Sequence, residues 1–317
     1  MEKKHEYYDV VIIGGGPAGL TAGIYAGRAK LKTLILEKSL VGGLATYTDE
    51  ILNYPGFPEG ISGTELMRNF QKQAKNFGVK FKLTDAKKID LDGPDKTVET
   101  FRNVYHAKAI VIATGNKPKV TGACREEKFL FDKGISFCAT CDAPSCQDKV
   151  VAVVGGGDSA FQEAIFLTKF AKNVHMIVRK DANHISATRA LYEEALKKEN
   201  LHMIYSTEVD EFVGEDYLQA LKLRSNQTGV VSELVVDRTF LFIGYTPDTE
   251  LFKNSITMTE QGYIPVDIHM QTNIPGVFAA GDVRETSVRQ VATAVGDGAA
   301  AGVEVERYIA QMECSDS

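Results

Sequence analysis

The stretch DVVIIGGGPAGLTAGIYAGRAKLKTLILEK, residues 9–38, decides the fold. The apolar run from Val10 to Ile13 predicts a buried parallel strand, and glycines in GxGxxG spacing follow it directly. A helix with a face of small residues comes next, and Leu34 to Leu36 predict a second strand that Glu37 ends. Strand, glycine turn, helix and terminal acid in this order predict a dinucleotide-binding fold.

Each glycine of this turn has its own expected role. Gly14 makes the turn, Gly16 lets the backbone approach a pyrophosphate, and Gly19 lets the helix pack on the strand. The amino end of the helix offers its exposed N–H groups and the positive end of its dipole to the phosphates. Glu37 lies where an acid accepts ribose hydroxyls. A tight strand-to-helix turn without any ligand is the alternative.

The same pattern returns over residues 149–179. KVVAVV predicts a strand, GGGDSA a turn in GxGxxA spacing, FQEAIFLTKF a helix and NVHMIV a strand. Two dinucleotide folds in one chain form an internal repeat. A fold of this kind can also keep its glycines for packing alone, so for the second turn a cofactor site and an empty domain both stay open.

Two further strands and two domain crossings complete the organisation. AIVIATG (109–115) and GVFAAGDV (276–283) predict strands that end in turns, and a helix is expected from Val288 to Ile309. Proline-containing crossings are expected near Pro118 and Pro247. We therefore predict an α/β protein with two Rossmann-like three-layer dinucleotide-binding domains, the second inserted into the first. Residues 1–118 and 247–317 would form the first domain, and residues 119–246 the second.

The bulk composition excludes several classes of protein. Hydrophobic content of 44% and charged content of 25% are typical of a soluble globular protein. A net charge of −6 argues against nucleic acid or an anionic membrane as the main partner. No apolar run is long enough to span a membrane. The amino terminus has no signal-peptide pattern, so we expect a cytoplasmic protein.

The motif CATCD, from Cys138 to Asp142, carries the expected chemistry. Two cysteines at this spacing can close and reopen a disulfide, and the thiolate pKa in such motifs is commonly lowered. Zinc would need a second ligand pair, and an iron–sulfur cluster built from C-x2-C-x4-C would need a fourth ligand, for which only Cys124 lies nearby. We therefore favour a redox pair and predict no metal site. Asp142 is a candidate proton carrier.

The three remaining cysteines, Cys124, Cys146 and Cys314, are expected to be free thiols. Cys146 is close enough in sequence to the CxxC pair to serve as an extra exchange partner.

These residues together resemble the low-molecular-weight thioredoxin reductases over essentially the whole chain. The matching pieces are GGGPAG, LNYPGF, the ATG strand end, CATCD placed just before GGGDSA, GYTP, GVFAAGDV and RQVATAVGDG. Their order and spacing are specific, whereas no single piece would be.

The resemblance implies a bound FAD and a set of residues around it. Pyrophosphate contacts are implied for the first glycine turn, ribose contacts for Glu37, and flavin or ribityl contacts for the remainder. The implied FAD-binding residues are Gly14, Gly16, Pro17, Ala18, Gly19, Glu37, Gly43, Leu44, Asn53, Gly115, Gly281, Asp282, Arg289, Gln290 and Val291.

The resemblance also implies roles in the reaction. Electrons would pass through FAD to a Cys138–Cys141 disulfide and on to a thioredoxin-like protein. Cys141 would face the flavin, Cys138 would attack the disulfide of thioredoxin, and Asp142 would supply the proton. A homodimer is implied, with an inserted domain that rotates about linkers containing Pro118 and Pro247.

The electron donor is the open question, because of VRKDANH at residues 178–184. NADPH-using members usually carry a pattern like HRRxxxR here, whose bases pair with the 2′-phosphate. This chain has Val178, Arg179 and Lys180, and the distal position falls on His184, or on Ser186 if the loop carries an insertion. NADH would want an acid at the strand end, and none is present.

Two donors therefore stay open. NADPH would use the glycine turn together with the two bases; the residues of that site are Gly155, Gly157, Asp158, Ser159, Ala160, Arg179 and Lys180. Ferredoxin, a small acidic iron–sulfur protein, would instead dock near the flavin, and we lean slightly away from efficient use of NADPH. Ordinary variation of a surface loop is the third explanation.

Two other classes of function remain as alternatives. A flavin dithiol oxidase would pass electrons from a small dithiol to oxygen with the same architecture. A non-catalytic FAD-binding protein is disfavoured by the intact CATCD.

Overall fold

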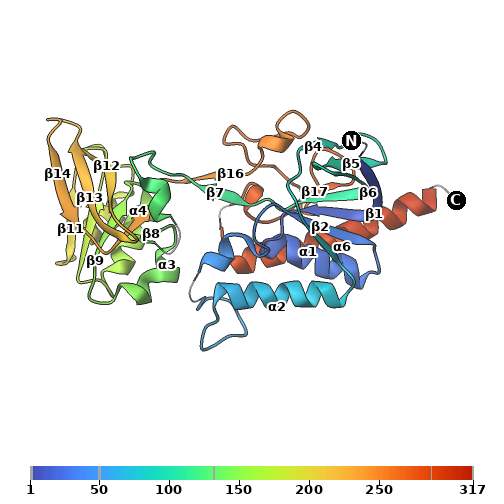
Figure 1. Cartoon of the computed structure of the whole chain (residues 1–317), viewed down its shortest axis with the longest axis horizontal. Helices are drawn as coiled ribbons and strands as arrows, with labels where there is room; N and C mark the ends of the chain where they lie inside the picture. Colours follow the sequence, from blue (N-terminus) through green and yellow to red (C-terminus); the bar gives the residue numbers. More distant parts are fainter. Residues whose placement is uncertain (1–2, 49–50, 131–132, 287, 316–317) are drawn as a thin grey trace. The chain divides into compact units, whose positions relative to one another are not determined.

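The structure is a computed structural model that describes residues 3–48, 51–130, 133–286 and 288–315, without the side chains of Thr140, Cys141 and Ser315. The chain forms two compact units (Figure 1), one mainly from residues 1–46, 51–117 and 246–317 and the other mainly from residues 118–245. The chain passes between them through β7 (Asn116–Pro118) and β16 (Tyr245–Pro247), which pair as a two-stranded sheet.

The first unit is built on a sheet that has seven strands within the described residues. Their spatial order is β3 (Lys80–Leu83), β2 (Thr33–Glu37), β1 (Lys4–Ile13), β6 (Asn103–Ile112), β5 (Lys96–Glu99) and β4 (Lys88–Asp90), and β17 (Val277–Ala279) also pairs with β6. β1 runs parallel to both β2 and β6, whereas β5 pairs antiparallel with β4 and β6. The buried run at the end of β1 is apolar because neighbouring layers cover both faces of the sheet there.

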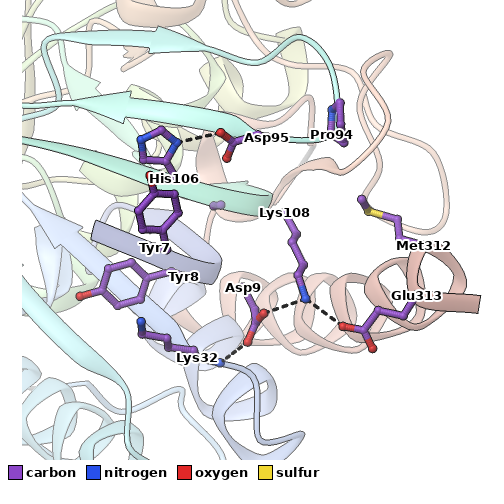
Figure 2. A pocket seen from close by; sticks show the side chains of 11 residues that line it. Tyr7, Tyr8, Asp9, Lys32, Pro94, Asp95, His106, Lys108, Met312 and Glu313 are labelled. Atoms are coloured by element: carbon purple, nitrogen blue, oxygen red, sulfur yellow. Dashed lines mark hydrogen bonds and ion pairs between the residues drawn. The ribbon is translucent and has the colours of Figure 1, made fainter. Parts of the chain in front are cut away.

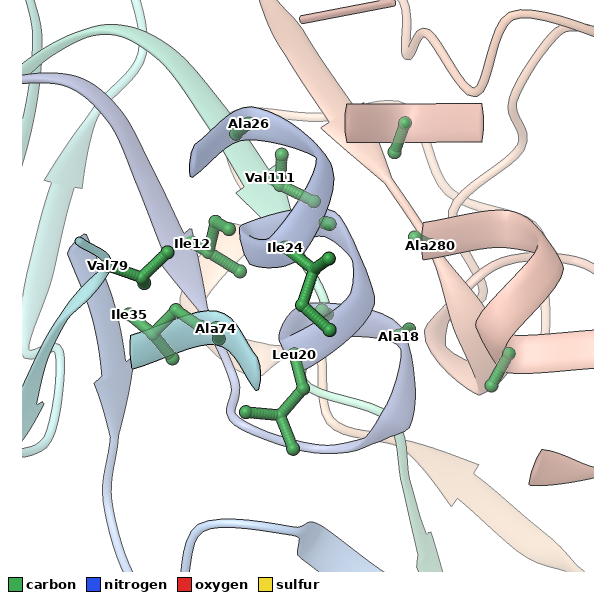
Figure 3. Close-up of a cluster of buried hydrophobic side chains, with 14 of the residues drawn as sticks. Ile12, Ala18, Leu20, Ile24, Ala26, Ile35, Ala74, Val79, Val111 and Ala280 are labelled. Atoms are coloured by element: carbon green, nitrogen blue, oxygen red, sulfur yellow. The ribbon is translucent and has the colours of Figure 1, made fainter. Parts of the chain in front are cut away.

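Three helices cover one face of this sheet: α1 (Pro17–Arg28), α2 (Gly63–Asn76) and α6 (Val291–Ser315). Figure 3 shows how strand residues such as Ile12 and Ile35 pack against Leu20 and Ile24 of α1. Each such side chain contributes about 1.5–3 kcal/mol when fully buried. The other face packs against the segment around η4 (Glu250–Phe252), in which Phe252 is fully buried.

The second unit has three layers. The middle layer is a parallel sheet in the order β11 (Leu201–Ile204), β10 (Asn173–Ile177), β9 (Val150–Val154), β15 (Arg238–Leu241) and β8 (Ile135–Ser136). The helical layer contains α3 (Ala139–Asp142), η3 (Ala143–Cys146), α4 (Asp158–Leu167) and α5 (Arg189–Ala195). The opposite face is covered by an antiparallel sheet of β12 (Thr207–Gly214), β13 (Leu218–Ser225) and β14 (Val231–Val235), together with η2 (Glu126–Phe129). This is the α/β class that the sequence predicts.

Several predicted boundaries were wrong. β1 starts at Lys4 because its polar first half pairs with the start of β6, with Lys4 opposite Asn103. The last helix begins at Val291 rather than Val288, since the Thr293 hydroxyl accepts the Gln290 N–H and caps the helix, and it continues to Ser315. The predicted strand over 276–283 keeps only Val277–Ala279, and η5 (Gly281–Val283) follows.

Candidate functional site

The first glycine turn has the geometry that its spacing predicts. Gly14 has a φ of +109°, and a Cβ there would lie 2.2 Å from the carbonyl oxygen of Ala113. A Cβ on Gly19 would lie 1.9 Å from the Gly14 oxygen, so helix and strand touch at this point. A Cβ on Gly16 would meet only one atom, at 4.0 Å. The turn is therefore closed where helix and strand pack and open at Gly16, where a pyrophosphate would approach.

Glu37 is held against this turn by backbone groups. Its carboxylate accepts the Gly15 N–H at 2.8 Å and the Ser39 N–H at 2.9 Å, and the side chain is buried. The Ser39 hydroxyl also donates to this carboxylate, at 3.3 Å. A carboxylate has about four acceptor positions, so one remains for a further donor such as a ribose hydroxyl. Gly43 lies beside the same turn, since a Cβ there would be 3.3 Å from the Gly16 Cα.

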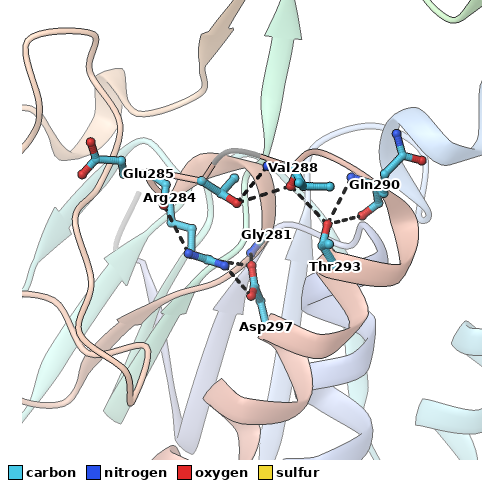
Figure 4. A network of polar contacts seen from close by, with 8 residues as sticks. Gly281, Arg284, Glu285, Val288, Gln290, Thr293 and Asp297 are labelled. Atoms are coloured by element: carbon cyan, nitrogen blue, oxygen red, sulfur yellow. Dashed lines mark hydrogen bonds and ion pairs between the residues drawn. The ribbon is translucent and has the colours of Figure 1, made fainter.

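A second group of polar residues surrounds η5, at the end of β17. Asp297 of α6 accepts two hydrogen bonds from Arg284, at 2.6 and 2.7 Å, and a third from the Gly281 N–H at 3.1 Å (Figure 4). Gly281 has a φ of +78°, a left-handed conformation that favours glycine. The ion pair of Arg284 and Asp297 thus fixes the turn that presents Asp282. Sequence reasoning missed both partners, because they look like ordinary surface charges.

Asp282 is a half-buried acid. Burial raises its pKa to about 6, with Arg289 acting in the opposite direction and Asp297 in the same direction. It forms no hydrogen bond or ion pair with any residue that the structure describes. The Nε of Arg289 is also buried without a hydrogen-bond partner among the described atoms, although its guanidinium lies 4.8 Å from the centre of the Tyr263 ring. Buried polar groups left unpaired in this way call for a ligand.

The structure brings together residues that are remote in the sequence. The Asn53 side-chain amide donates to the Gln290 side-chain oxygen at 2.9 Å, although they are 237 residues apart. Gly115 has a φ of +70° and its carbonyl accepts the Asp248 N–H at 3.0 Å. The glycine cradle, Glu37, Asp282 and Arg289 all belong to the first unit and fit a dinucleotide cofactor of the FAD type.

The CxxC motif lies in the second unit, at α3. Cys138 directly precedes the helix and is disulfide-bonded. The side chain of Cys141 lies outside the described part, so the structure does not test its role. Asp142 ends α3 and forms an ion pair with Arg238 of β15 at 3.1 Å. The sequence analysis did not identify Arg238.

Cys124 and Cys146, which lie on either side of the CxxC motif in the sequence, differ in environment. Cys146 is fully buried in the core under α3, and burial raises the pKa of its thiol, although Arg238 acts in the opposite direction. A buried thiol of this kind is inert in disulfide exchange, which argues against Cys146 as an extra exchange partner. Cys124 is exposed and not disulfide-bonded.

The second glycine turn is also well formed. Gly155 has a φ of +152°, and a Cβ there would lie 2.5 Å from the Phe242 oxygen and 2.7 Å from the Ala160 Cβ. A Cβ on Gly157 would meet nothing within 4 Å, so the turn is open at that point. The same three roles thus recur: a tight turn, an open approach and close packing of the helix.

The loop that follows β10 folds back onto this turn. The Ser186 N–H donates to the Gly156 oxygen at 3.2 Å, and the Thr188 N–H donates to the Asp158 carboxylate at 2.6 Å. Val178 is buried beneath the turn, 3.0 Å from a Cβ built on Gly156. Its side chain therefore serves packing, and a ribose would have to be recognised by the exposed residues around it.

Three cations lie between the end of β10 and the start of α5. The side chain of Arg179 is 76% exposed and reaches Glu208 only at 3.8 Å, while Lys180 donates to the Ser186 hydroxyl at 3.0 Å. Arg189, the first residue of α5, is 90% exposed and pairs with Glu193. The sequence analysis missed Arg189, whose position beside Asp158 follows from the folded-back loop.

One hollow in the first unit is unrelated to these residues. It has a volume of about 450 Å³ and lies where Lys108 joins Asp9 at 3.1 Å and Glu313 at 2.8 Å (Figure 2). None of the predicted site residues lines it. Lys108 in this hollow is paired with acids, and the Lys32 ammonium lies 5.0 Å from the centre of the Tyr8 ring.

Comparison with known proteins agrees with this geometry. Residues 8–298 match the pyridine nucleotide-disulphide oxidoreductase family. The thioredoxin reductase of Peptoclostridium litorale is 42% identical over 311 residues, covering 96% of this chain and 98% of that protein.

The chain belongs to the pyridine nucleotide-disulphide oxidoreductase family. Among solved members, the thioredoxin reductase of Streptococcus pyogenes is 39% identical with a TM-score of 0.83, covering 96% of this chain and 99% of that one. A ferredoxin-flavin thioredoxin reductase from Clostridium acetobutylicum is 28% identical with a TM-score of 0.52, covering 97% and 99%. These findings confirm the predicted family and fold class.

Thioredoxin reductases of this pyridine nucleotide-disulphide oxidoreductase family are flavoproteins, which supports the predicted FAD at the level of the family. Among the described helices, none is long and apolar enough to cross a membrane.

Proposed function

We propose that this chain is a flavin-dependent thioredoxin reductase that passes electrons to the disulfide of a thioredoxin-like protein. The observation that carries the proposal is the disulfide-bonded Cys138 at the start of α3, in a chain 42% identical to a thioredoxin reductase over nearly its whole length. An intact redox motif in a dinucleotide-binding fold favours an enzyme over a protein that only binds FAD.

In this proposal the first unit holds FAD. Bound FAD supplies a carrier that accepts and releases two electrons. The open backbone at Gly16 admits the pyrophosphate, Glu37 accepts the ribose hydroxyls, and Asp282 and Arg289 gain the polar partners that they lack in the described residues. The other residues proposed for this site are Gly14, Pro17, Ala18, Gly19, Gly43, Leu44, Asn53, Gly115, Gly281, Gln290 and Val291.

The pair Cys138 and Cys141 carries out the exchange with the partner. A thiolate of Cys138 attacks the partner's disulfide and forms a mixed disulfide, and Cys141 then attacks Cys138 to close the bridge and release the reduced partner. Cys138 is half-buried, so part of the residue faces solvent. Asp142, whose N–H donates to the Cys138 carbonyl at 3.2 Å, handles the protons of these steps.

Two donors are proposed for the first half of the reaction. NADPH would lie on the second turn, at Gly155, Gly157, Asp158, Ser159 and Ala160, with Arg179 and Lys180 facing the 2′-phosphate. Exposure of these two cations and of Arg189 supports this arrangement. Reduced ferredoxin is the other donor, supported by the solved ferredoxin-flavin thioredoxin reductase and by the apolar, buried Val178 at the strand end. A homodimer, with an inserted domain that rotates about Pro118 and Pro247, completes the proposal.

An anaerobic titration of the FAD-loaded protein tests these points. NADPH, NADH and reduced ferredoxin are added separately while the flavin absorbance is followed. Bleaching by stoichiometric NADPH would assign NADPH as donor, and bleaching by ferredoxin alone would assign ferredoxin. Thioredoxin reduction that persists in Cys141→Ser would overturn the role of the pair, and the unchanged FAD content of that variant is the control for folding.

A further inference from the structure

Asp142, at the end of α3, and Arg238, at the start of β15, form an ion pair. The Arg238 Nη1 lies 3.1 Å from the Asp142 Oδ2, and the two side chains are only 17% and 12% exposed. Arg238 begins β15, the strand between β9 and β8, so an inner strand of the parallel sheet supplies the cation. Asp142 directly follows Cys141 in the sequence. A charge pair with little exposure to water is only weakly screened.

The backbone of Asp142 is held as firmly as its side chain. Its N–H donates to the Cys138 oxygen at 3.2 Å, and its carbonyl accepts the Ser145 hydroxyl at 2.7 Å and the Cys146 thiol at 3.4 Å. Lys149 is another charged group near this corner, where it favours the ionised form of Cys146, and α4 is a helix that packs on α3. These bonds fix the backbone of Asp142 beside the CxxC motif.

This arrangement decides the resting charge of Asp142. Arginine is protonated at every relevant pH, and an opposite charge within about 4–6 Å favours the ionised form of a carboxyl group. A carboxylate has no proton to give. If Asp142 handles protons in the exchange, it must first receive one.

We propose that Arg238 is a positioning residue of the dithiol chemistry, which keeps Asp142 ionised so that it accepts a proton before it donates one. The proposal rests on the function proposed above and deepens it. In the reduced enzyme, the Asp142 carboxylate takes the proton of the attacking thiol and leaves a thiolate. That thiolate attacks the partner's disulfide, one partner sulfur leaves, and the leaving sulfur takes the proton back from Asp142.

In the second thiol–disulfide exchange the mixed disulfide is resolved, which accounts for the remaining proton and bond. The resolving thiol attacks the mixed disulfide, the bond to the partner breaks, and the proton of the resolving thiol goes to the second partner sulfur. The enzyme loses two hydrogens and the partner gains two. Asp142 returns to the carboxylate form that Arg238 stabilises.

The test is the pH profile of a single exchange step in the FAD-loaded protein. Every variant carries Cys124→Ser and Cys314→Ser, which remove the two exposed cysteines outside the pair. The protein is reduced chemically and freed of reductant, and its reaction with the small disulfide dithionitrobenzoate is followed by stopped flow. This assay requires neither thioredoxin nor an electron donor, so a chain that fails to reduce thioredoxin would refute the proposed function and leave this test intact.

We expect the rate of the exchange to fall at low pH as Asp142 becomes protonated, and we call this falling part of the pH–rate profile the acid limb. Loss of the Arg238 charge should displace the acid limb along the pH axis. Arg238→Met should move the midpoint of that limb upward by about 1 pH unit or more, with a rate loss of roughly tenfold per unit on its acid side. Arg238→Lys keeps the charge and should restore most of the wild-type profile. Arg224→Met is the matched control, because Arg224 pairs with an acid in the same unit, Asp210, at 2.7 Å but with half-exposed side chains.

Superimposed profiles of the wild type and a folded Arg238→Met variant would overturn the proposal. If Arg238→Met does not fold, Asp142→Asn decides the question. The acid limb should vanish in that variant, and a persisting wild-type limb would show that Asp142 does not accept the proton.

Discussion

The buried ion pair at η5 allows a stability effect to be worked from the structure. Asp297 accepts three hydrogen bonds from Arg284 and the Gly281 N–H, with side chains that are 11% exposed for Asp297 and 20% for Arg284. Asp297→Asn keeps the shape of the side chain and removes its negative charge. It also replaces one acceptor oxygen by an NH2 group, which then faces an N–H donor of Arg284 or Gly281. Removing one partner of a buried ion pair lowers the free energy of unfolding by about 3–5 kcal/mol. Arg284 is partly exposed, so we expect a loss near the lower end of this range.

A loss of about 3 kcal/mol corresponds to a fall in Tm of roughly 6–12 °C for a domain of this size. The assay is differential scanning calorimetry of the protein freed of FAD. We also expect weaker retention of FAD, because Asp297 holds the turn that presents Asp282.

The control is Asp210→Asn. Asp210 also binds an arginine through two bonds, at 2.9 and 2.7 Å, but the pair is half-exposed. A pair of this kind contributes about 0–1 kcal/mol. Equal shifts in Tm for the two variants, or a shift below about 2 °C for Asp297→Asn, would refute the reasoning from burial.

Three further predictions follow from the site. Gly19→Ala places a Cβ 1.9 Å from the Gly14 oxygen, so we expect a protein with little bound FAD, measured by absorbance after purification. The raised pKa of Asp282, about 6, means that the FAD-free protein binds more protons than the unfolded chain between about pH 4 and 6. Its stability should therefore fall as pH rises through that window, and Asp282→Asn should abolish this part of the pH dependence in thermal melts. Cys146→Ala should keep disulfide reduction and cost about 1 kcal/mol of stability, since the thiol is buried, whereas Cys138→Ser should abolish reduction in the thioredoxin assay.

Local patterns were predicted correctly wherever neighbouring residues decide the structure. The glycine turns after β1 and β9 follow from spacing, because helix and strand approach closely only where no Cβ intervenes. The buried strands follow from apolar runs. The roles of the individual FAD-site and CxxC residues remain predictions.

Helix and strand ends were predicted less well, because tertiary contacts decide them. The polar residues from Lys4 onward form a strand only because β6 lies alongside to pair with them. The start of α6 depends on the Thr293 cap, which competes with three more residues of helix.

The sequence by itself determined the family, the α/β class, the two glycine turns and the redox motif. Only the tertiary structure decided the long-range polar pairs: Asn53 with Gln290, Arg284 with Asp297, and Asp142 with Arg238. In a sequence each of the four charged residues in these pairs looks like a solvated surface residue, since nothing local tells a shielded arginine from an exposed one. Burial is a property of the packed layers, and low exposure is what turns the two ion pairs into supports of the proposed flavin site and of the dithiol chemistry.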